Sequence, residues 1–205
     1  MASSSILADV FHDALSEHLD IIRRLATENE AFTRAATLLS RCLMRGNKIL
    51  WCGNGGSAAD AQHLAAELVG RFRRRRSPMA SVALTTDTSV LTSIANDFGF
   101  EQVFERQVEA LCHEGDALVG ISTSGDSANV CAALHRAREL DAFTIAMTGE
   151  SGGHLAQCAD VWLRVPSSDP ARIQEGHILL GHMLCDCLDR DLCVEEQFEA
   201  AGMAL

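Results

Sequence analysis

The sequence predicts an α/β protein in which a parallel sheet of five strands is covered by helices on both faces. Two observations predict this fold class. Short apolar runs alternate with helical stretches from residue 49 onward, which is typical of parallel strands joined by helical crossovers. Two of these runs end in turns rich in Gly and Ser directly before a helix. Ligands bind such sheets at the carboxyl ends of the strands, and the 205 residues are expected to form one domain, 1–205.

Composition limits the classes of partner. The formal net charge of −11 disfavours general nucleic-acid binding, which needs clustered Lys and Arg to neutralise phosphates. It still allows a small phosphorylated ligand held by local dipoles. The eight Cys lack CxxC spacing, and we interpret them as reduced core thiols rather than metal ligands or disulfides. No apolar run approaches the roughly 18 residues that span a bilayer, so we expect a cytoplasmic protein without a membrane partner.

Two amphipathic helices, at about 6–27 and 29–44, are predicted ahead of the first strand, and Gly46 closes the second. Their apolar stripes are suited to wrapping the domain or to building a bundle with another copy. We favour the bundle because the α/β region that follows is complete by itself. The helices at about 6–44 are therefore expected to contribute to oligomerisation.

The organising stretch begins with an apolar strand at residues 49–51 and a Gly-rich turn at 53–56. A helix over 58–69 should follow, with Ser57 as its N-cap and Asp60 three residues on. Amide groups and the positive end of the helix dipole point the same way at such a junction, which predicts an anion site. The pattern is neither GxGxxG nor GxxxxGK[ST].

A run of basic residues, 71–76, follows this helix. We interpret it as a solvated loop, with a ligand or partner site as the alternative. Arg71 is the exception, because it stands four residues beyond Glu67 and is a candidate to face the same pocket.

The remaining elements follow in order. Strands are predicted at 79–84, 116–121, 143–147 and 161–165, and helices at about 88–94, 102–112, 128–140 and 170–190. Residues 85–88 should cap the first of these helices and 96–100 should form a turn after it. The serine-rich turn 122–127 precedes the helix at 128, with Ser127 as its N-cap. Residues 149–153 form a Gly-rich loop, 155–158 a short turn, and a loose acidic tail should end the chain.

Four serines in the two matching turns carry the first chemical signal. Hydroxyls and helix-start amides can hold a phosphate without Lys or Arg, whereas the alternative is that each Ser only caps or turns. Because two similar turns are present, we expect a phosphate site built from Ser57, Ser122, Ser124 and Ser127.

Metal-ligand types supply the second signal. His63 and Glu67 lie four apart on one helix, and Gln174 and His182 lie eight apart on the last helix with His177 between them. If the helices face each other, these side chains suit Zn²⁺. Spacing alone leaves open the alternative that each His has only a structural role, with its ring hydrogen-bonded within the protein.

The motifs GNGGS, QHLAAEL, NDFGF, STSGDSANV and ARIQEGH occur in this order. With them the chain resembles the sugar isomerase (SIS) domain family and, within it, the bacterial sedoheptulose 7-phosphate isomerases. The resemblance extends from the leading helices to about Leu188. It implies a flavodoxin-like three-layer α/β/α sandwich and a homotetramer with active sites at subunit interfaces. It also implies an aldose-ketose isomerase that converts sedoheptulose 7-phosphate to D-glycero-D-manno-heptose 7-phosphate through an enediol, for lipopolysaccharide heptose.

The resemblance assigns roles to individual positions. It makes Glu67 the catalytic base and His182 the acid, and one Zn²⁺ per subunit would be held by His63, Glu67, Gln174 and His182. The implied substrate-binding residues are Asn54, Gly55, Gly56, Ser57, Glu67, Asn96, Asp97, Ser122, Thr123, Ser124, Ser127 and Gln174. Ala171 is a departure, because some members carry a helper Asp there.

Two alternative functions remain to be weighed against the isomerase. Some SIS relatives are catalytically silent scaffolds that bind the replication initiator DnaA. They lack the acid and base, whereas this chain has Glu67 and His182, which favours the enzyme. The other rival is an isomerase or regulator for a different phosphosugar, since the loops that select the sugar cannot be placed from sequence.

Overall fold

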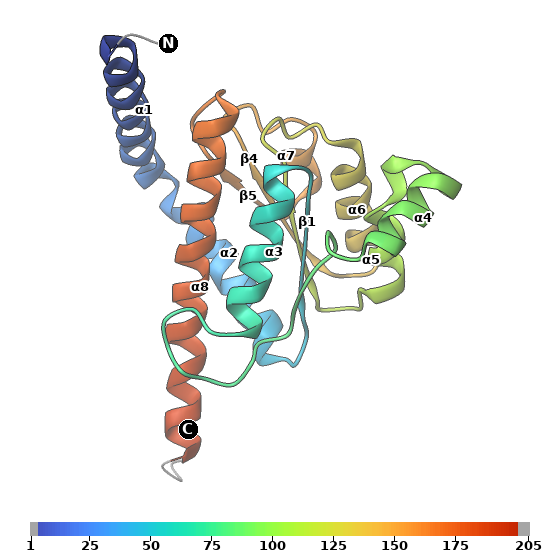
Figure 1. Ribbon diagram of the computed structural model, residues 1–205. Coiled ribbons are helices and arrows are strands. Elements are labelled where there is room, and N and C mark those ends of the chain that lie inside the picture. Colours follow the sequence, from blue (N-terminus) through green and yellow to red (C-terminus); the bar gives the residue numbers. More distant parts are fainter. Residues whose placement is uncertain (1–3, 201–205) are drawn as a thin grey trace.

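The computed structural model describes residues 4–200, and the surroundings of side chains for residues 6–192. Within these residues the chain begins with two helices joined by a 3-10 turn and continues as five strands separated by helices (Figure 1). The elements in order are α1 (Ser4–Leu25), η1 (Ala26–Glu28), α2 (Asn29–Met44), β1 (Ile49–Gly53), α3 (Gly56–Val69), β2 (Ser81–Ala83), α4 (Thr88–Phe98), η2 (Phe100–Gln102), α5 (Glu105–Leu111), β3 (Ala117–Ile121), α6 (Ala128–Glu139), β4 (Phe143–Thr148), α7 (Leu155–Cys158), β5 (Val161–Arg164) and α8 (Pro170–Ala200).

The strands form one parallel sheet in the order β2-β1-β3-β4-β5. This is the flavodoxin-like order, whose direction of winding reverses between β1 and β3. Gly53 at the end of β1 pairs with Ile121 at the end of β3, so the turns that follow these strands leave the sheet side by side. The predicted α/β fold is confirmed, and the switch point coincides with the two serine-bearing turns.

Alternating side chains divide the interior into two cores. Ile49 and Trp51 of β1 are buried in the core formed with α2, α3 and α8, while Leu50 and Cys52 are buried in the core formed with α5, α6 and α7. Because successive strand residues point to opposite faces, a continuous apolar run is the expected signature of a strand covered on both sides. Figure 1 shows these two helical layers on opposite faces of the sheet.

The leading helices differ in how much of their surface is covered. Residues of α2 such as Leu39 are fully buried in the first core. In contrast, α1 extends past the sheet (Figure 1) and leaves Leu7, Val10 and Phe11 more than 60% exposed, at 62%, 64% and 62%. An apolar face of this kind on a long helix is typical of an interaction surface.

Several predicted boundaries were wrong. The helix after β1 begins at Gly56 with Gly55 as N-cap, so Ser57 is not the N-cap, and its amide bonds to the Asn54 carbonyl rather than to Asp60. Glycine at the turn allows the helix to start earlier than side-chain capping would require.

Two further corrections concern helix ends. Asn96 and Asp97 lie inside α4 rather than in a turn, because the chain reverses only at Gly99, whose φ is +97°. The predicted loose tail after residue 190 is wrong as far as Ala200, since α8 continues to that residue; residues 201–205 lie outside the described part of the chain.

Five of the seven described cysteines are buried, as expected for core thiols, whereas Cys131 and Cys187 are half-buried. None of the described helices combines the length and apolar character needed to cross a membrane.

Candidate active site

The turn after β1 presents backbone amides at the start of α3. Gly55 adopts a φ of +56° as the N-cap, a conformation that favours glycine over residues with a Cβ. Gly55 and Gly56 are exposed, and Ser57 in the first helical turn is 3% exposed. The positive end of the α3 dipole therefore faces an open, side-chain-poor surface, as an anion site requires.

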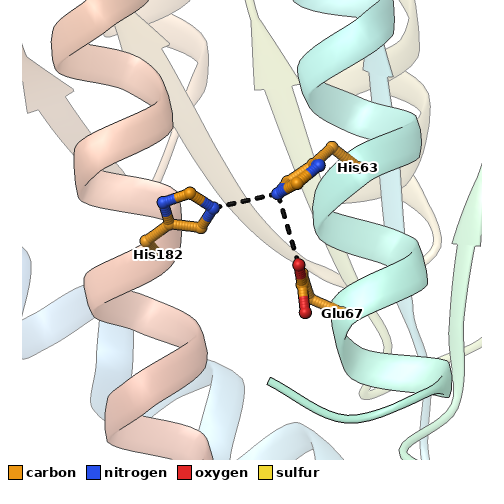
Figure 2. A group of neighbouring side chains, drawn as sticks. All are labelled: His63, Glu67 and His182. Atoms are coloured by element: carbon orange, nitrogen blue, oxygen red, sulfur yellow. Dashed lines mark hydrogen bonds and ion pairs between the residues drawn. The ribbon is translucent and has the colours of Figure 1, made fainter. Parts of the chain in front are cut away.

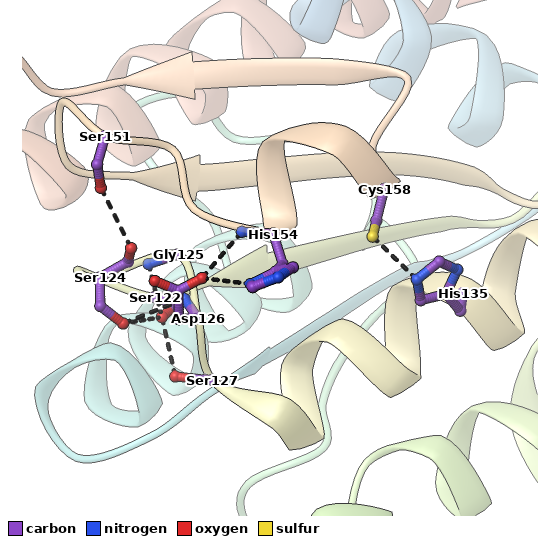
Figure 3. A network of polar contacts seen from close by, with 9 residues as sticks. All are labelled: Ser122, Ser124, Gly125, Asp126, Ser127, His135, Ser151, His154 and Cys158. Carbon is purple, nitrogen blue, oxygen red and sulfur yellow. Dashed lines mark hydrogen bonds and ion pairs between the residues drawn. The ribbon is translucent and has the colours of Figure 1, made fainter.

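The turn after β3 gathers hydroxyl groups. Ser122 Oγ lies 2.9 Å from Ser127 Oγ and 3.4 Å from Ser124 Oγ, and it accepts a 3.2 Å hydrogen bond from the Gly125 amide. Figure 3 shows the three hydroxyls meeting before α6. Ser127 occupies the predicted N-cap position but makes no side-chain cap bond, because its hydroxyl contacts Ser122 instead. The cluster offers several donors that can turn toward an anion.

A reciprocal amide pair joins the two turns. Asn54 Nδ2 donates to Asn129 Oδ1 and Asn129 Nδ2 donates to Asn54 Oδ1, both at 2.9 Å. Asn129 lies in the first turn of α6 and is 3% exposed. The pair holds the two helix N-termini at one edge of the sheet. Asn129 was not predicted from the sequence, because only its contact with Asn54 across the switch point gives it a role.

A second cluster lies between α3 and α8. His63 Nε2 is 2.9 Å from His182 Nε2 and 3.4 Å from Glu67 Oε1. Figure 2 shows the three side chains converging from the two helices. One ligand atom from each lies within 4.8 Å of the others. Two imidazoles and a carboxylate form a donor set of the type found in zinc sites, so the cluster fits a divalent metal.

Burial and neighbouring charge tune this cluster. The pKa of His182 is lowered by burial and by His63, with Glu67 opposing the shift. Asp60 lies one turn before His63, and burial raises the pKa of its carboxyl to about 6, with His63 opposing the shift. Its Oδ2 atom is buried and has no hydrogen-bond partner among the described residues. A neutral His182 can accept a proton or bind a metal through its ring nitrogen.

Gln174 links the two parts of the site. A Cβ built on Gly56 would lie 2.5 Å from Gln174 Nε2, so the amide packs directly against the glycine turn. Gln174 stands eight residues before His182, about 12 Å along α8. Three of the four predicted metal ligands therefore form the cluster, and the Gln174 amide lies at the glycine turn.

The other predicted positions are more dispersed. Asn96 donates to Asp97 at 2.7 Å on the exposed end of α4, and Thr123 is half-buried in the serine turn. Ala171 is exposed, and its amide bonds to Asp169, which caps α8. The four-residue spacing that made Arg71 a candidate for the Glu67 pocket does not apply, because α3 ends at Val69 and Arg71 lies beyond it.

The chain is similar to known proteins in sequence and in fold. The family model described as SIS domain matches residues 15–149. The phosphoheptose isomerase of Aquifex aeolicus is 56% identical over 158 residues, which cover 77% of this chain and 83% of the relative. The phosphoheptose isomerase of Neisseria gonorrhoeae is 58% identical over 163 residues, with 78% and 83% covered. A solved phosphoheptose isomerase from Francisella tularensis aligns with a TM-score of 0.84 and 39% identity, covering 93% of this chain and all of that one.

The fold and the matched region define the class of protein. The chain belongs to the SIS domain family and, within that family, to the phosphoheptose isomerases, which are aldose-ketose isomerases acting on phosphosugars.

Proposed function

We propose that the chain interconverts sedoheptulose 7-phosphate and D-glycero-D-manno-heptose 7-phosphate, supplying the heptose of lipopolysaccharide. The observation that carries the proposal is the arrangement along α3. Its first turn offers the anion site, and His63 follows seven residues later, about 10 Å along the axis. That separation suits a long sugar chain with its phosphate at one end and its reacting carbons at the other.

In the proposed reaction the phosphate is held by the two turns. Ser57, Ser122, Ser124 and Ser127 supply hydroxyls, and the start of α3 supplies amides and its dipole. Binding energy at the phosphate end orients the distant carbons C1 and C2 near the second cluster.

Proton transfer between C1 and C2 needs a base and an acid on either side of an enediol. We assign the base to Glu67, which would remove a proton from C1 of the ketose while His182 protonates the C2 carbonyl oxygen, giving the enediol. Return of the proton from Glu67 to C2, with loss of the O1 proton, would then give the aldose. The two groups approach the same space from α3 and α8.

Zinc is a further part of the proposal. His63, Glu67 and His182 would hold the ion, and the family resemblance names Gln174 as the fourth ligand. A bound zinc ion would polarise the substrate oxygens as a Lewis acid. The chain's own residues would still orient the sugar and move the protons.

We also propose a homotetramer whose subunits complete each other's sites. The apolar face of α1 and the exposed surface of the site support this arrangement, since Gly55, Gly56 and the 48% exposed side chain of His63 lie open in one chain. The tetramer would be measured by light scattering after gel filtration, and a monomer at micromolar concentration would contradict it. The cytoplasmic location expected from composition stays a prediction.

The experiment is a coupled assay with sedoheptulose 7-phosphate on metal-analysed protein, with and without added Zn²⁺. Turnover that follows the bound zinc supports the substrate and the ligand set together. Turnover independent of zinc supports the substrate alone. Equal turnover of five- or six-carbon phosphates would contradict the heptose assignment, and absent turnover together with specific binding to DnaA would favour the scaffold.

A further inference from the structure

The loop between α3 and β2 contains the unusual basic run, and its residues contact both helices of the second cluster. We call residues 70–76 the arginine loop. It leaves the end of α3 a few residues beyond Glu67 and crosses to α8 beside His182. The sequence predicted a solvated segment, yet two of its side chains are packed against the site.

Arg76 anchors the arginine loop at both helices. Its side chain is 2% exposed, and its Nε donates to Asp189 Oδ1 of α8 at 2.6 Å. The same guanidinium donates to the Leu68 carbonyl at 2.9 Å and to the Glu67 carbonyl at 3.1 Å. These carbonyls belong to the last turn of α3, where intrahelical partners run out. Arg76 therefore ties the backbone of Glu67 to α8.

Asp189 completes the anchor from the opposite side. It is fully buried, and its Oδ2 accepts hydrogen bonds from the Arg73 and Arg74 amides at 2.8 and 3.0 Å. The backbone of the arginine loop is thus held on α8 one residue away from Phe72.

Phe72 uses that position to contact His182. Their rings stack with centroids 5.3 Å apart and an interplanar angle of 24°. The Arg73 guanidinium lies 5.3 Å from the Phe72 centroid. His63 meets the His182 ring edge-on at 5.1 Å, so His182 is bounded by Phe72 and His63 together.

From these contacts we infer that the arginine loop positions His182 opposite Glu67, with Phe72 as the positioning residue for the imidazole and Arg76 with Asp189 as the anchor. The inference rests on the proposed roles of Glu67 and His182. A displacement of reacting groups by about 1 Å can lower the reaction rate about a hundredfold. Because the arginine loop fixes α3, α8 and the His182 ring relative to one another, it should affect turnover directly.

The test compares Phe72→Leu with Phe72→Tyr, because leucine keeps an apolar side chain without the ring and tyrosine keeps the ring. For Phe72→Leu we expect kcat to fall about ten- to a hundredfold, with KM within about threefold because the phosphate turns are untouched. Phe72→Tyr should retain most of kcat. Arg75→Ala, an exposed change in the same loop, is the matched control and should leave kcat unchanged.

A second readout does not depend on turnover. Zinc affinity, measured by competition with a chromophoric chelator, should fall at least about fivefold in Phe72→Leu and stay unchanged in Phe72→Tyr and Arg75→Ala. Melting temperatures of all variants would be recorded, so that a folded Phe72→Leu protein carries the conclusion even if an Arg76 variant unfolds.

The outcomes separate this inference from the proposed function. Full kcat and full zinc affinity in folded Phe72→Leu would overturn the positioning role, as would a raised KM with unchanged kcat. Retained activity in Glu67→Gln would instead remove the proposed mechanism. If wild-type protein does not turn over the heptose phosphate, the zinc measurement alone decides whether Phe72 positions His182.

Discussion

The strand, turn and helix units β1–α3 and β3–α6 resemble each other locally but differ in what their helices face. Each turn carries serine at a helix start, and the Asn54–Asn129 pair joins them. Farther along, His63 of α3 meets His182 of α8. In α6, His135 instead lies 3.0 Å from Cys158 Sγ of α7 (Figure 3).

The difference comes from the face of the sheet that each helix covers. Helix α3 packs in the core with α8, and α6 packs in the other core with α5 and α7. Two equivalent turns can therefore share one phosphate, whereas only one helix brings a carboxylate and an imidazole to a second histidine-bearing helix. In the proposed function the local motif serves phosphate binding, and the packing partner of the helix serves the chemistry.

The largest expected effect tests the catalytic half of this contrast. Glu67→Gln should lower kcat about a thousandfold, because the amide cannot act as a base, while KM stays within about threefold. The matched change on the other unit, His135→Gln, should leave both constants unchanged. Steady-state kinetics with sedoheptulose 7-phosphate measure the effect, and a loss below tenfold in Glu67→Gln would refute the assigned base.

The shared binding function is tested next. Ser122→Ala removes the central hydroxyl of the serine turn and should raise KM about ten- to a hundredfold, as for the loss of a hydrogen bond to a charged group. Ser151→Ala changes a neighbouring exposed serine whose hydroxyl donates to the Ser124 carbonyl, and its KM should stay near that of the wild type. A similar KM for both variants would argue against phosphate binding at this turn.

A third prediction concerns the pH dependence of stability and contrasts two histidines of α8, the buried His177 and His182 of the second cluster. Burial lowers the pKa of His177 to about 4, and neither ring nitrogen has a hydrogen-bond partner among the described residues. Between pH 6.5, the ordinary pKa of His, and about 4, the unfolded chain binds a proton that the native protein does not. The free energy of unfolding should therefore decrease as the pH is lowered, by up to about 1.4 kcal/mol per pH unit.

Melting temperatures from pH 7 to pH 5 would measure this slope. His177→Gln cannot take up the proton and should show a smaller decrease than the wild type. The exposed His113→Gln is the control and should follow the wild type. Parallel curves for wild type and His177→Gln would contradict the assignment of acid sensitivity to this residue.

The smallest effect concerns the link between the two units. Asn54→Ala and Asn129→Ala should each lower the free energy of unfolding by about 1 to 2 kcal/mol, because each leaves a partly buried amide unpaired. The double variant should cost less than the sum by about 1 kcal/mol. Urea unfolding of the four proteins measures this coupling, and strict additivity would mean that the turns are held together by other contacts.

Local sequence determined much of the protein. The continuous apolar runs and intervening helices predicted the parallel sheet, and its carboxyl edge carries the two predicted turns because all strands run the same way. His63 and Glu67 share one helix, so their proximity followed from a spacing of four residues. The assignment of residues 1–205 to one domain stays a prediction.

Tertiary structure decided the contacts that join distant segments. The meeting of His63 with His182, the Asn54–Asn129 pair and the Arg76–Asp189 anchor each bridge 75 residues or more. Periodicity describes one face of one helix and contains no information on which helix packs against it. The sequence identifies a basic run after α3. Only the packing of α3 beside α8 shows that the Arg76 side chain is buried against Asp189, and only the structure shows that α3 ends before Arg71.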